Sequence, residues 1–376
     1  MKKHISGFRL GLLTVVVSVW WFVGGCAPIP GQPESILGTP KHHSYNGFKL
    51  LKKGRLDDAQ REFEISLQLQ PNFSTAHRGM GLVYGMKKQF KPAFRSMDFA
   101  RDYARGKDEE ALVFVGFMRL YMMKNGKGWM EEVEENFNHA TSLIADLPDA
   151  YYYMGVAYKN GYRFSDSEKA FKKVLEINKS LITEADEQLK IVQKIERAMP
   201  ESEFGKKVAL MNRITRADVA GLFVKELTLD QIFEKARPKQ EHTDIRTLSL
   251  PPDVKNHPLK KDMGTVLQWH IKGLSPFPDG TFRPDELITW ADYAIMVADI
   301  IAKAEDDPTL ATKYVGTRTP FKDVGNDVPY FNALMVCTTR GGIMEAKNGI
   351  FNPMRNVSGA DALLVLRKLK EELEIS

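Results

Sequence analysis

The chain has 376 residues, of which 43% are apolar and 27% are charged, and its formal net charge is +5. This length suggests two or three domains, and the composition fits folded soluble domains, which argues against a disordered chain and a multi-span membrane protein. The small charge, without a basic cluster, argues against a nucleic-acid partner, and the two cysteines exclude a disulfide-rich scaffold and a multi-cysteine zinc site.

The N-terminal segment has the pattern of a secretory signal. Lys2, Lys3 and Arg9 form a positive head, and the apolar run 10–23 follows it. This run is shorter than the roughly 20 apolar residues that a spanning helix needs, and it ends in small residues. We expect the segment to be removed, and without its three charges the mature chain keeps +2.

The end of this segment, Val23-Gly24-Gly25-Cys26, resembles the lipobox of bacterial lipoproteins. The resemblance implies a lipoprotein signal peptide at 1–25 and a Cys26 acylated with chains such as palmitate, which together anchor a protein stably. Ala27 resembles the sorting pattern for the outer membrane, so we expect a lipid-anchored protein of the bacterial cell envelope that faces the periplasm. The alternative is an ordinary signal peptide or short anchor with an incidental cysteine. Residues 26–40 are rich in Pro and Gly and predict an extended tether.

A period of 34 residues runs through the next part of the chain. The pairs with this spacing are Gly47 and Gly81, Ala59 and Ala93, Phe63 and Met97, and Phe137 and Phe171. The distance from Met97 to Phe137 is 40 residues, which predicts an insertion near 124–128.

This pattern resembles the tetratricopeptide repeat, a helix-turn-helix unit of about 34 residues in which a small residue of the first helix lets the second helix pack closely. The resemblance covers residues 41–200 and implies an α-solenoid whose stacked units bury a continuous core. An amphipathic helix at 181–198 is expected to cap the array.

The same resemblance implies a concave groove that is lined by the first helix of each unit and binds a peptide or helix of a partner protein. The positions that match the groove are Phe48, Arg78, Leu82, Met86, Tyr152, Val156 and Lys159. The alternative is that several of these side chains only pack between repeats.

A different repeat begins after about residue 205. The pairs Gly280 and Gly349, Phe282 and Phe351, and Pro284 and Pro353 all share an offset of 69 residues. After each loop a Thr or Ser is followed three residues later by Asp, which predicts a capped helix, at Thr289…Asp292 and Ser358…Asp361. A third cap, Ile214-Thr215-Arg216-Ala217-Asp218, lies upstream.

These copies resemble the S-layer homology domain, whose unit is a helix, a Gly-x-Phe-x-Pro loop, a cap and a second helix. Three caps imply three units around a pseudo-threefold axis, at about 205–236, 252–303 and 320–373, with the first truncated. We therefore expect a mainly α chain, in which a tetratricopeptide α-solenoid is followed by a degenerate, α-helical S-layer homology domain at 205–376.

Members of this family bind polysaccharide linked to peptidoglycan, and the arginine of each cap contacts anionic groups such as ketal-linked pyruvate. Here only Arg216 keeps that arginine, and Trp290 and Gly359 stand at the equivalent positions. The glycan-binding candidates are Arg216, Trp290 and Arg283. For Trp290, stacking on a sugar and filling a crevice are both open, and Arg283 is either a solvated loop charge or a contact to an acidic glycan.

No catalytic, phosphate-binding or metal-ligating motif appears, and Cys337 stands in an apolar stretch typical of an inert thiol. We expect a non-catalytic envelope lipoprotein without a cofactor or metal. Its solenoid would bind an unidentified envelope protein, and its C-terminal domain would attach to cell-wall polysaccharide or peptidoglycan. The alternative is an outer-membrane lipoprotein that serves as a scaffold for assembly or polysaccharide export, with a purely structural C-terminal region.

Overall fold

The computed structural model describes residues 38–236 and 249–374. The expected signal peptide at 1–25, Cys26 and most of the tether lie outside the described residues. Within them the chain is mainly helical, as predicted, and its only extended pairings are isolated bridges. None of the helices in these two ranges is long and apolar enough to cross a bilayer.

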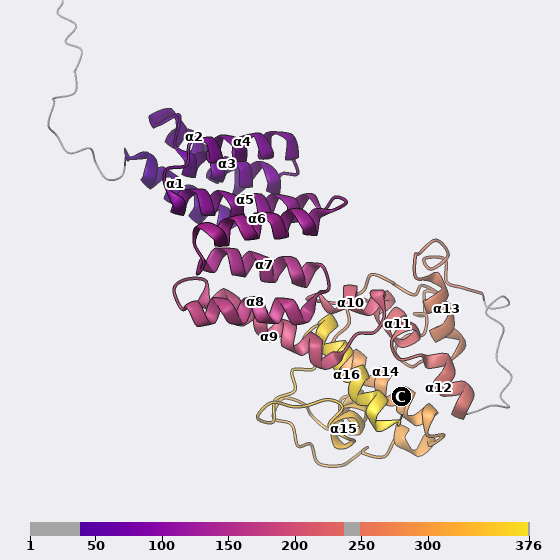
Figure 1. The fold of residues 1–376 in the computed structure, drawn as a ribbon. Helices are drawn as coiled ribbons and strands as arrows, with labels where there is room; N and C mark the ends of the chain where they lie inside the picture. Colours follow the sequence, from indigo (N-terminus) through magenta and orange to yellow (C-terminus); the bar gives the residue numbers. More distant parts are fainter. Residues whose placement is uncertain (1–37, 237–248, 375–376) are drawn as a thin grey trace, which may run out of the picture.

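Residues 40–198 form a stack of antiparallel helix pairs that ends in a single helix (Figure 1). The pairs are α1 (Pro40–Lys52) with α2 (Leu56–Leu69), α3 (Ser74–Met86) with α4 (Phe90–Asp102), α5 (Lys107–Lys124) with α6 (Trp129–Leu143), and α7 (Pro148–Asn160) with α8 (Phe164–Ile177), and α9 (Ile182–Ala198) follows. Each of α3, α5 and α7 also contacts the second helix of the preceding pair. This arrangement is the predicted helical-repeat solenoid.

Small residues in the first helix of a pair allow the close packing that the repeat requires. A Cβ added to Gly47 would lie 2.6 Å from Cε1 of Phe63, and one added to Gly155 would lie 2.8 Å from Cε1 of Phe171. Both phenylalanines are fully buried. The glycines are therefore needed because the aromatic rings occupy the space that a side chain would fill.

The third pair contains the predicted insertion. Helix α5 has 18 residues, whereas α3 and α7 have 13 each. It ends at Lys124, and the capping residue Asn125 that follows has a left-handed φ of 45°, a conformation that asparagine tolerates better than most residues. The extra residues therefore lengthen the first helix by more than one turn.

The stack curves toward its odd-numbered helices. Contacts join α1 to α3, α3 to α5 and α5 to α7, whereas no comparably extensive contact joins the even-numbered helices of the described array. Lys52 at the end of α1 even pairs with Glu184 near the start of α9, at 2.5 Å between Nζ and Oε1. We call the side formed by the odd-numbered helices the inner face.

The expected capping helix α9 does not end the structure. It packs against α8 on one side and against α16 (Gly359–Glu372) of the C-terminal domain on the other (Figure 1). Lys194 on α9 donates to the Asp361 carboxylate at 2.6 Å. The apolar stripe that predicted a cap therefore belongs to a helix shared by the two parts of the molecule.

The C-terminal domain is built from short helices around one apolar core. Before α16 it contains α10 (Glu203–Ala209), α11 (Arg216–Lys225), α12 (Leu229–Ala236), α13 (Lys260–Gln268), α14 (Trp290–Ala304), the 3₁₀ helix η2 (Pro308–Ala311) and α15 (Phe331–Thr339). Tyr293 is fully buried in this core, stacks on Phe223 and donates its hydroxyl to the carbonyl of Ala362 at 3.0 Å. The core thus joins α11, α14 and α16.

The segments that lead into these three helices meet in a closed ring. The N–H of Ile214 donates to the carbonyl of Val357 (3.1 Å), that of Val357 to Ile288 (3.0 Å), and that of Ile288 to Ile214 (3.0 Å). Each side chain is almost fully buried. Three equivalent residues that bond cyclically define a pseudo-threefold axis, which is the arrangement that the three caps predicted.

Candidate functional site

Around the ring, the start of each cap helix lies against the neighbouring unit. The N–H of Arg216 donates to the carbonyl of Glu286 (2.9 Å), that of Trp290 to Arg355 (3.0 Å), and that of Gly359 to Met211 (2.9 Å). We call these contacts the first, second and third junctions. They are the places where the family resemblance expects ligand sites.

An aspartate holds each Gly-x-Phe-x-Pro loop in shape. The carboxylate of Asp253 accepts from the N–H groups of Phe282 (3.0 Å) and Arg283 (2.7 Å), and Asp323 does the same for Phe351 (2.9 Å) and Asn352 (2.7 Å). Partial burial alone would raise the pKa of each carboxyl, but these N–H donors hold both pKa values below the usual range. The two aspartates therefore fix the backbone of each loop, and with it the positions of the residues that flank the loop.

At the first junction, Arg216 does not present a free guanidinium. Its side chain is 6% exposed, and Nε, Nη1 and Nη2 donate to the carbonyls of Phe282 (2.8 Å), Gly273 (2.6 Å) and Ser275 (3.0 Å). Burial lowers its pKa, although the nearby Glu286 and Asp292 carboxylates act in the opposite direction. Arg216 thus ties α11 to the second unit.

The first junction also has the wrong charge for an anionic sugar. Arg216 lines a pocket of about 300 Å³ together with the carboxylates of Glu286 and Asp292. The exposed Arg283 lies beside this pocket, where it pairs with Asp279 at 3.0 Å and with Glu286 at 3.9 Å. It also stacks on Phe277, a residue of the pocket lining, at 3.9 Å. Both arginines at this junction are thus already engaged, Arg216 by carbonyls and Arg283 by carboxylates, and the remaining negative charge disfavours an anion.

At the second junction, Trp290 is partly buried and its indole N–H lacks a partner. Its Nε1 is buried without a hydrogen bond among the described residues. The ring packs edge-on against Phe351, with centroids 6.1 Å apart, and it lines a pocket of about 110 Å³. Trp290 therefore fills a crevice and leaves a donor unused, and stacking on a sugar stays a prediction.

The second junction contains an arginine that sequence reasoning missed. Arg355 lies with its guanidinium carbon 5.7 Å from the Trp290 ring centroid and lines the same pocket, beside Lys347. Neither cation has an ion-pair partner among the described residues, whereas Glu345 at the pocket pairs with Lys368. Arg355 stands 69 residues after Glu286, so the same repeat offset could have found it.

The third junction is closed. A Cβ added to Gly359 would lie 1.7 Å from the carbonyl oxygen of Val208, which is fully buried at the end of α10. The glycine that replaces the family's arginine is therefore a steric requirement of the shortened first unit. No side chain fits at position 359 of this cap.

The cap residues behave largely as predicted. Thr215 with Asp218 and Thr289 with Asp292 form complete capping boxes. Ser358 accepts the N–H of Asp361 at 3.2 Å and contacts one oxygen of its carboxylate at 2.7 Å, while the other oxygen accepts from Lys194 at 2.6 Å, so this cap is not a complete capping box. The three acids are structural residues.

On the inner face of the solenoid the predicted residues differ in accessibility. Leu82 is fully buried in the core cluster, so its assignment to a groove was wrong, whereas Met86 is 40% exposed. The half-buried positions are Phe48, Arg78, Tyr152, Val156 and Lys159. Burial lowers the pKa of Lys159, and its Nζ donates to Gln188 on α9 at 2.5 Å. Sequence reasoning missed Arg119 on the inner face of α5. The spacing from Gly116 to Arg119 equals that from Gly81 to Tyr84, so the repeat alignment could have found this position.

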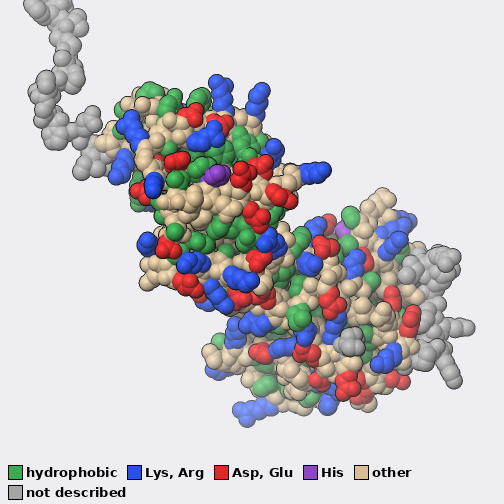
Figure 2. All heavy atoms as spheres, in the orientation of Figure 1, with side chains coloured by type: hydrophobic (Ala, Val, Ile, Leu, Met, Phe, Trp, Pro, Cys, Tyr) green, Lys and Arg blue, Asp and Glu red, His purple; other side chains and the backbone are tan. Residues whose placement is uncertain are grey.

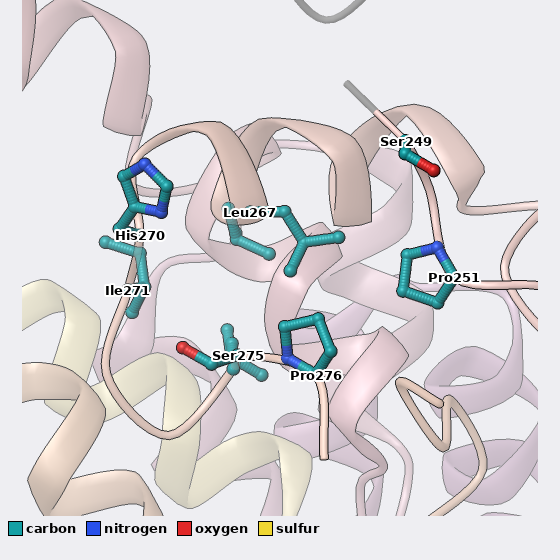
Figure 3. A pocket seen from close by; sticks show the side chains of 9 residues that line it. Ser249, Pro251, Leu267, His270, Ile271, Ser275 and Pro276 are labelled. Atoms are coloured by element: carbon teal, nitrogen blue, oxygen red, sulfur yellow. The ribbon is translucent and has the colours of Figure 1, made fainter. Parts of the chain in front are cut away.

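Other features offer little chemistry. The pocket in Figure 3, of about 200 Å³, is lined mainly by apolar side chains of α13 and of flanking loops, among them Leu267, Ile271 and Pro276, together with His270.

Burial raises the pKa of the Cys337 thiol. The described ranges contain no cluster of three or more His, Cys, Asp or Glu that could hold a metal. Figure 2 shows positive and negative side chains interspersed over the visible face.

Comparison with known proteins assigns one part of the chain. The S-layer homology domain family matches residues 320–363, which lie in the third unit. No curated protein matches the chain. A solved structure titled "Functional Characterization of Pseudomonas Aeruginosa pilF" is 13% identical, with 54% of this chain and 93% of that chain covered and a TM-score of 0.32. The family match confirms the expected resemblance for the third unit and points to the cell envelope or surface.

Proposed function

We propose that this protein is a non-catalytic tether of the bacterial cell envelope. The second junction binds anionic cell-wall polysaccharide, the solenoid binds a partner protein, and acylated Cys26 holds the N-terminus in the outer membrane. Weak attachments to separate layers reinforce one another, because each raises the effective concentration of the next.

The observation that carries this proposal is the chemistry of the second junction. An aromatic ring with an unused N–H suits the face of a sugar, and the unpaired Arg355 and Lys347 suit a carboxylate on it. The equivalent first junction has Glu286 in place of Arg355. The family match to residues 320–363, which include the loop on one side of this junction, supports the same ligand class.

Co-sedimentation with purified sacculi tests the wall-binding role. The protein is expected to pellet with sacculi that retain their attached polysaccharide and to stay in the supernatant with sacculi from which that polymer has been extracted. Equal recovery in the two supernatants would contradict wall binding, and would favour a scaffold for assembly or polysaccharide export with a structural C-terminal domain.

The lipid anchor has its own test. Cys26→Ser is expected to abolish incorporation of labelled palmitate and to move the protein from the membrane fraction to the soluble fraction, because the proposed acyl chains are then lost. Wall-free spheroplast membranes are the suitable material, since wall binding cannot retain the protein there. Unchanged membrane recovery would contradict the anchor.

A further inference from the structure

The inner face of the solenoid contains two guanidinium groups that lack polar partners. Arg78 on α3 and Arg119 on α5 form no hydrogen bond or ion pair with any described residue, and Nε of Arg119 is buried without a partner. Burying an unpaired charge is costly, so such groups usually mark a place where a counter-ion binds.

Aromatic rings hold both groups in place. The guanidinium carbon of Arg78 lies 4.6 Å from the ring centroid of Phe48, and that of Arg119 lies 4.6 Å from the centroid of Tyr153. A guanidinium over an aromatic ring keeps its N–H groups available to an acceptor, and its planar fork matches a carboxylate. The two forks are therefore fixed before any ligand arrives.

The two arginines are close enough to affect each other. Burial, and after it the charge of Arg119, lowers the pKa of Arg78 to about 10, so Arg78 remains charged at neutral pH. Asp149 on α7 and Glu109 on α5 are nearby acids, and the charge of each acts to raise the pKa of Arg78. Burial raises the pKa of Asp149, although both arginines act to lower it. Neither acid forms an ion pair with either arginine among the described residues, so both guanidinium groups stay available to a ligand.

We propose that Arg78 and Arg119 form a binding site for one carboxylate of an extended peptide segment of the partner protein. Two neighbouring guanidinium forks match the oxygens of one carboxylate, and the acids Asp149 and Glu109 beside them disfavour a polyanion such as a nucleic acid. The half-buried Phe48, Tyr152 and Tyr153 beside the arginines offer apolar contact to neighbouring peptide residues. This inference rests on the proposed protein-binding role of the solenoid and adds the chemistry of its ligand.

Two arrays of random heptapeptides, probed with the purified full chain, test this inference. Peptides fixed through their C-termini present only side-chain carboxylates, whereas peptides fixed through their N-termini also present a terminal carboxylate. We expect the bound peptides to require Asp or Glu on the first array, or a free terminus on the second. Replacing the carboxylate by an amide is expected to weaken binding about 10-fold or more.

Variants connect the binding to the two arginines. Arg119→Gln and Arg78→Gln are each expected to weaken binding of the selected peptides about 10-fold without loss of thermal stability, because each removes an unpaired charge. Arg95→Gln is the matched control, because exposed Arg95 on α4 also stacks on a ring, at 5.6 Å from Phe99. If neutral peptides bound as tightly as acidic ones, or if Arg119→Gln bound like the parent, this inference would be contradicted. The protein-binding role of the solenoid would not be affected by either result. No bound peptide on either array would overturn the inference together with the protein-binding role.

Discussion

Replacing Gly359 by alanine is expected to destabilise the C-terminal domain by about 3 kcal/mol, near the upper end for overpacked sites. The new Cβ would stand 1.7 Å from the carbonyl oxygen and 2.5 Å from the carbonyl carbon of Val208. Backbone atoms cannot rotate away as a flexible side chain can, and the N–H of Gly359 is fixed to Met211 at 2.9 Å. Helix α10 must therefore separate from α16.

Amide hydrogen exchange in α16 measures this effect, because it reports the free energy of opening of that helix and not of the solenoid. Gly126→Ala is the control for the general effect of removing a glycine, since the nearest atom to its Cβ is Cε of Lys124 at 4.0 Å. Gly359→Arg, which restores the family's residue, is expected to prevent folding of the domain. Unchanged protection of α16 in Gly359→Ala would contradict the closed third junction.

Phe171→Ala is expected to destabilise the solenoid by about 3–5 kcal/mol. Phe171 is fully buried, and its ring fills the space above Gly155 that no other side chain occupies. Its loss leaves a cavity between α7 and α8, which the neighbouring pairs cannot close without moving the stack. The denaturant midpoint, followed by amide exchange in α7 and α8, measures the loss.

Phe99→Ala provides the comparison for Phe171→Ala. Phe99 on α4 is 36% exposed, so its removal deletes less buried surface and leaves no enclosed cavity. We expect a cost of about 1 kcal/mol or less. Equal effects for the two variants would mean that the aromatic position of the repeat does not carry the packing assigned to it.

The sequence predicts most of the helical architecture because the relevant signals are local. A small residue on one helix and a large one on the next recur at fixed spacing, as at Gly47 and Phe63, and a Thr with an Asp three residues later fixes a helix start. Such patterns depend on neighbours within one repeat. The insertion at the end of α5 could be located for the same reason.

The candidate sites were harder to predict because they depend on contacts between distant segments. Arg216 matches the family motif, yet carbonyl groups more than 50 residues away take its N–H donors. The missing arginine at Gly359 looked like a lost contact, whereas the buried Val208 carbonyl excludes any side chain there. Arg355 was overlooked because the motif does not include its position, although its alignment with Glu286 was visible in the repeat.

The most direct test of wall attachment at the second junction is calorimetric titration of purified wall polysaccharide into the protein. Arg355→Gln is expected to weaken binding about 10-fold, because a charged hydrogen bond is lost, and Trp290→Phe is expected to weaken it by removing the indole N–H while keeping a ring. Arg283→Gln, an exposed arginine stacked on a ring in the equivalent loop, should bind like the parent. Equal affinities for the parent, Arg355→Gln and Trp290→Phe would contradict the second junction as the site of attachment.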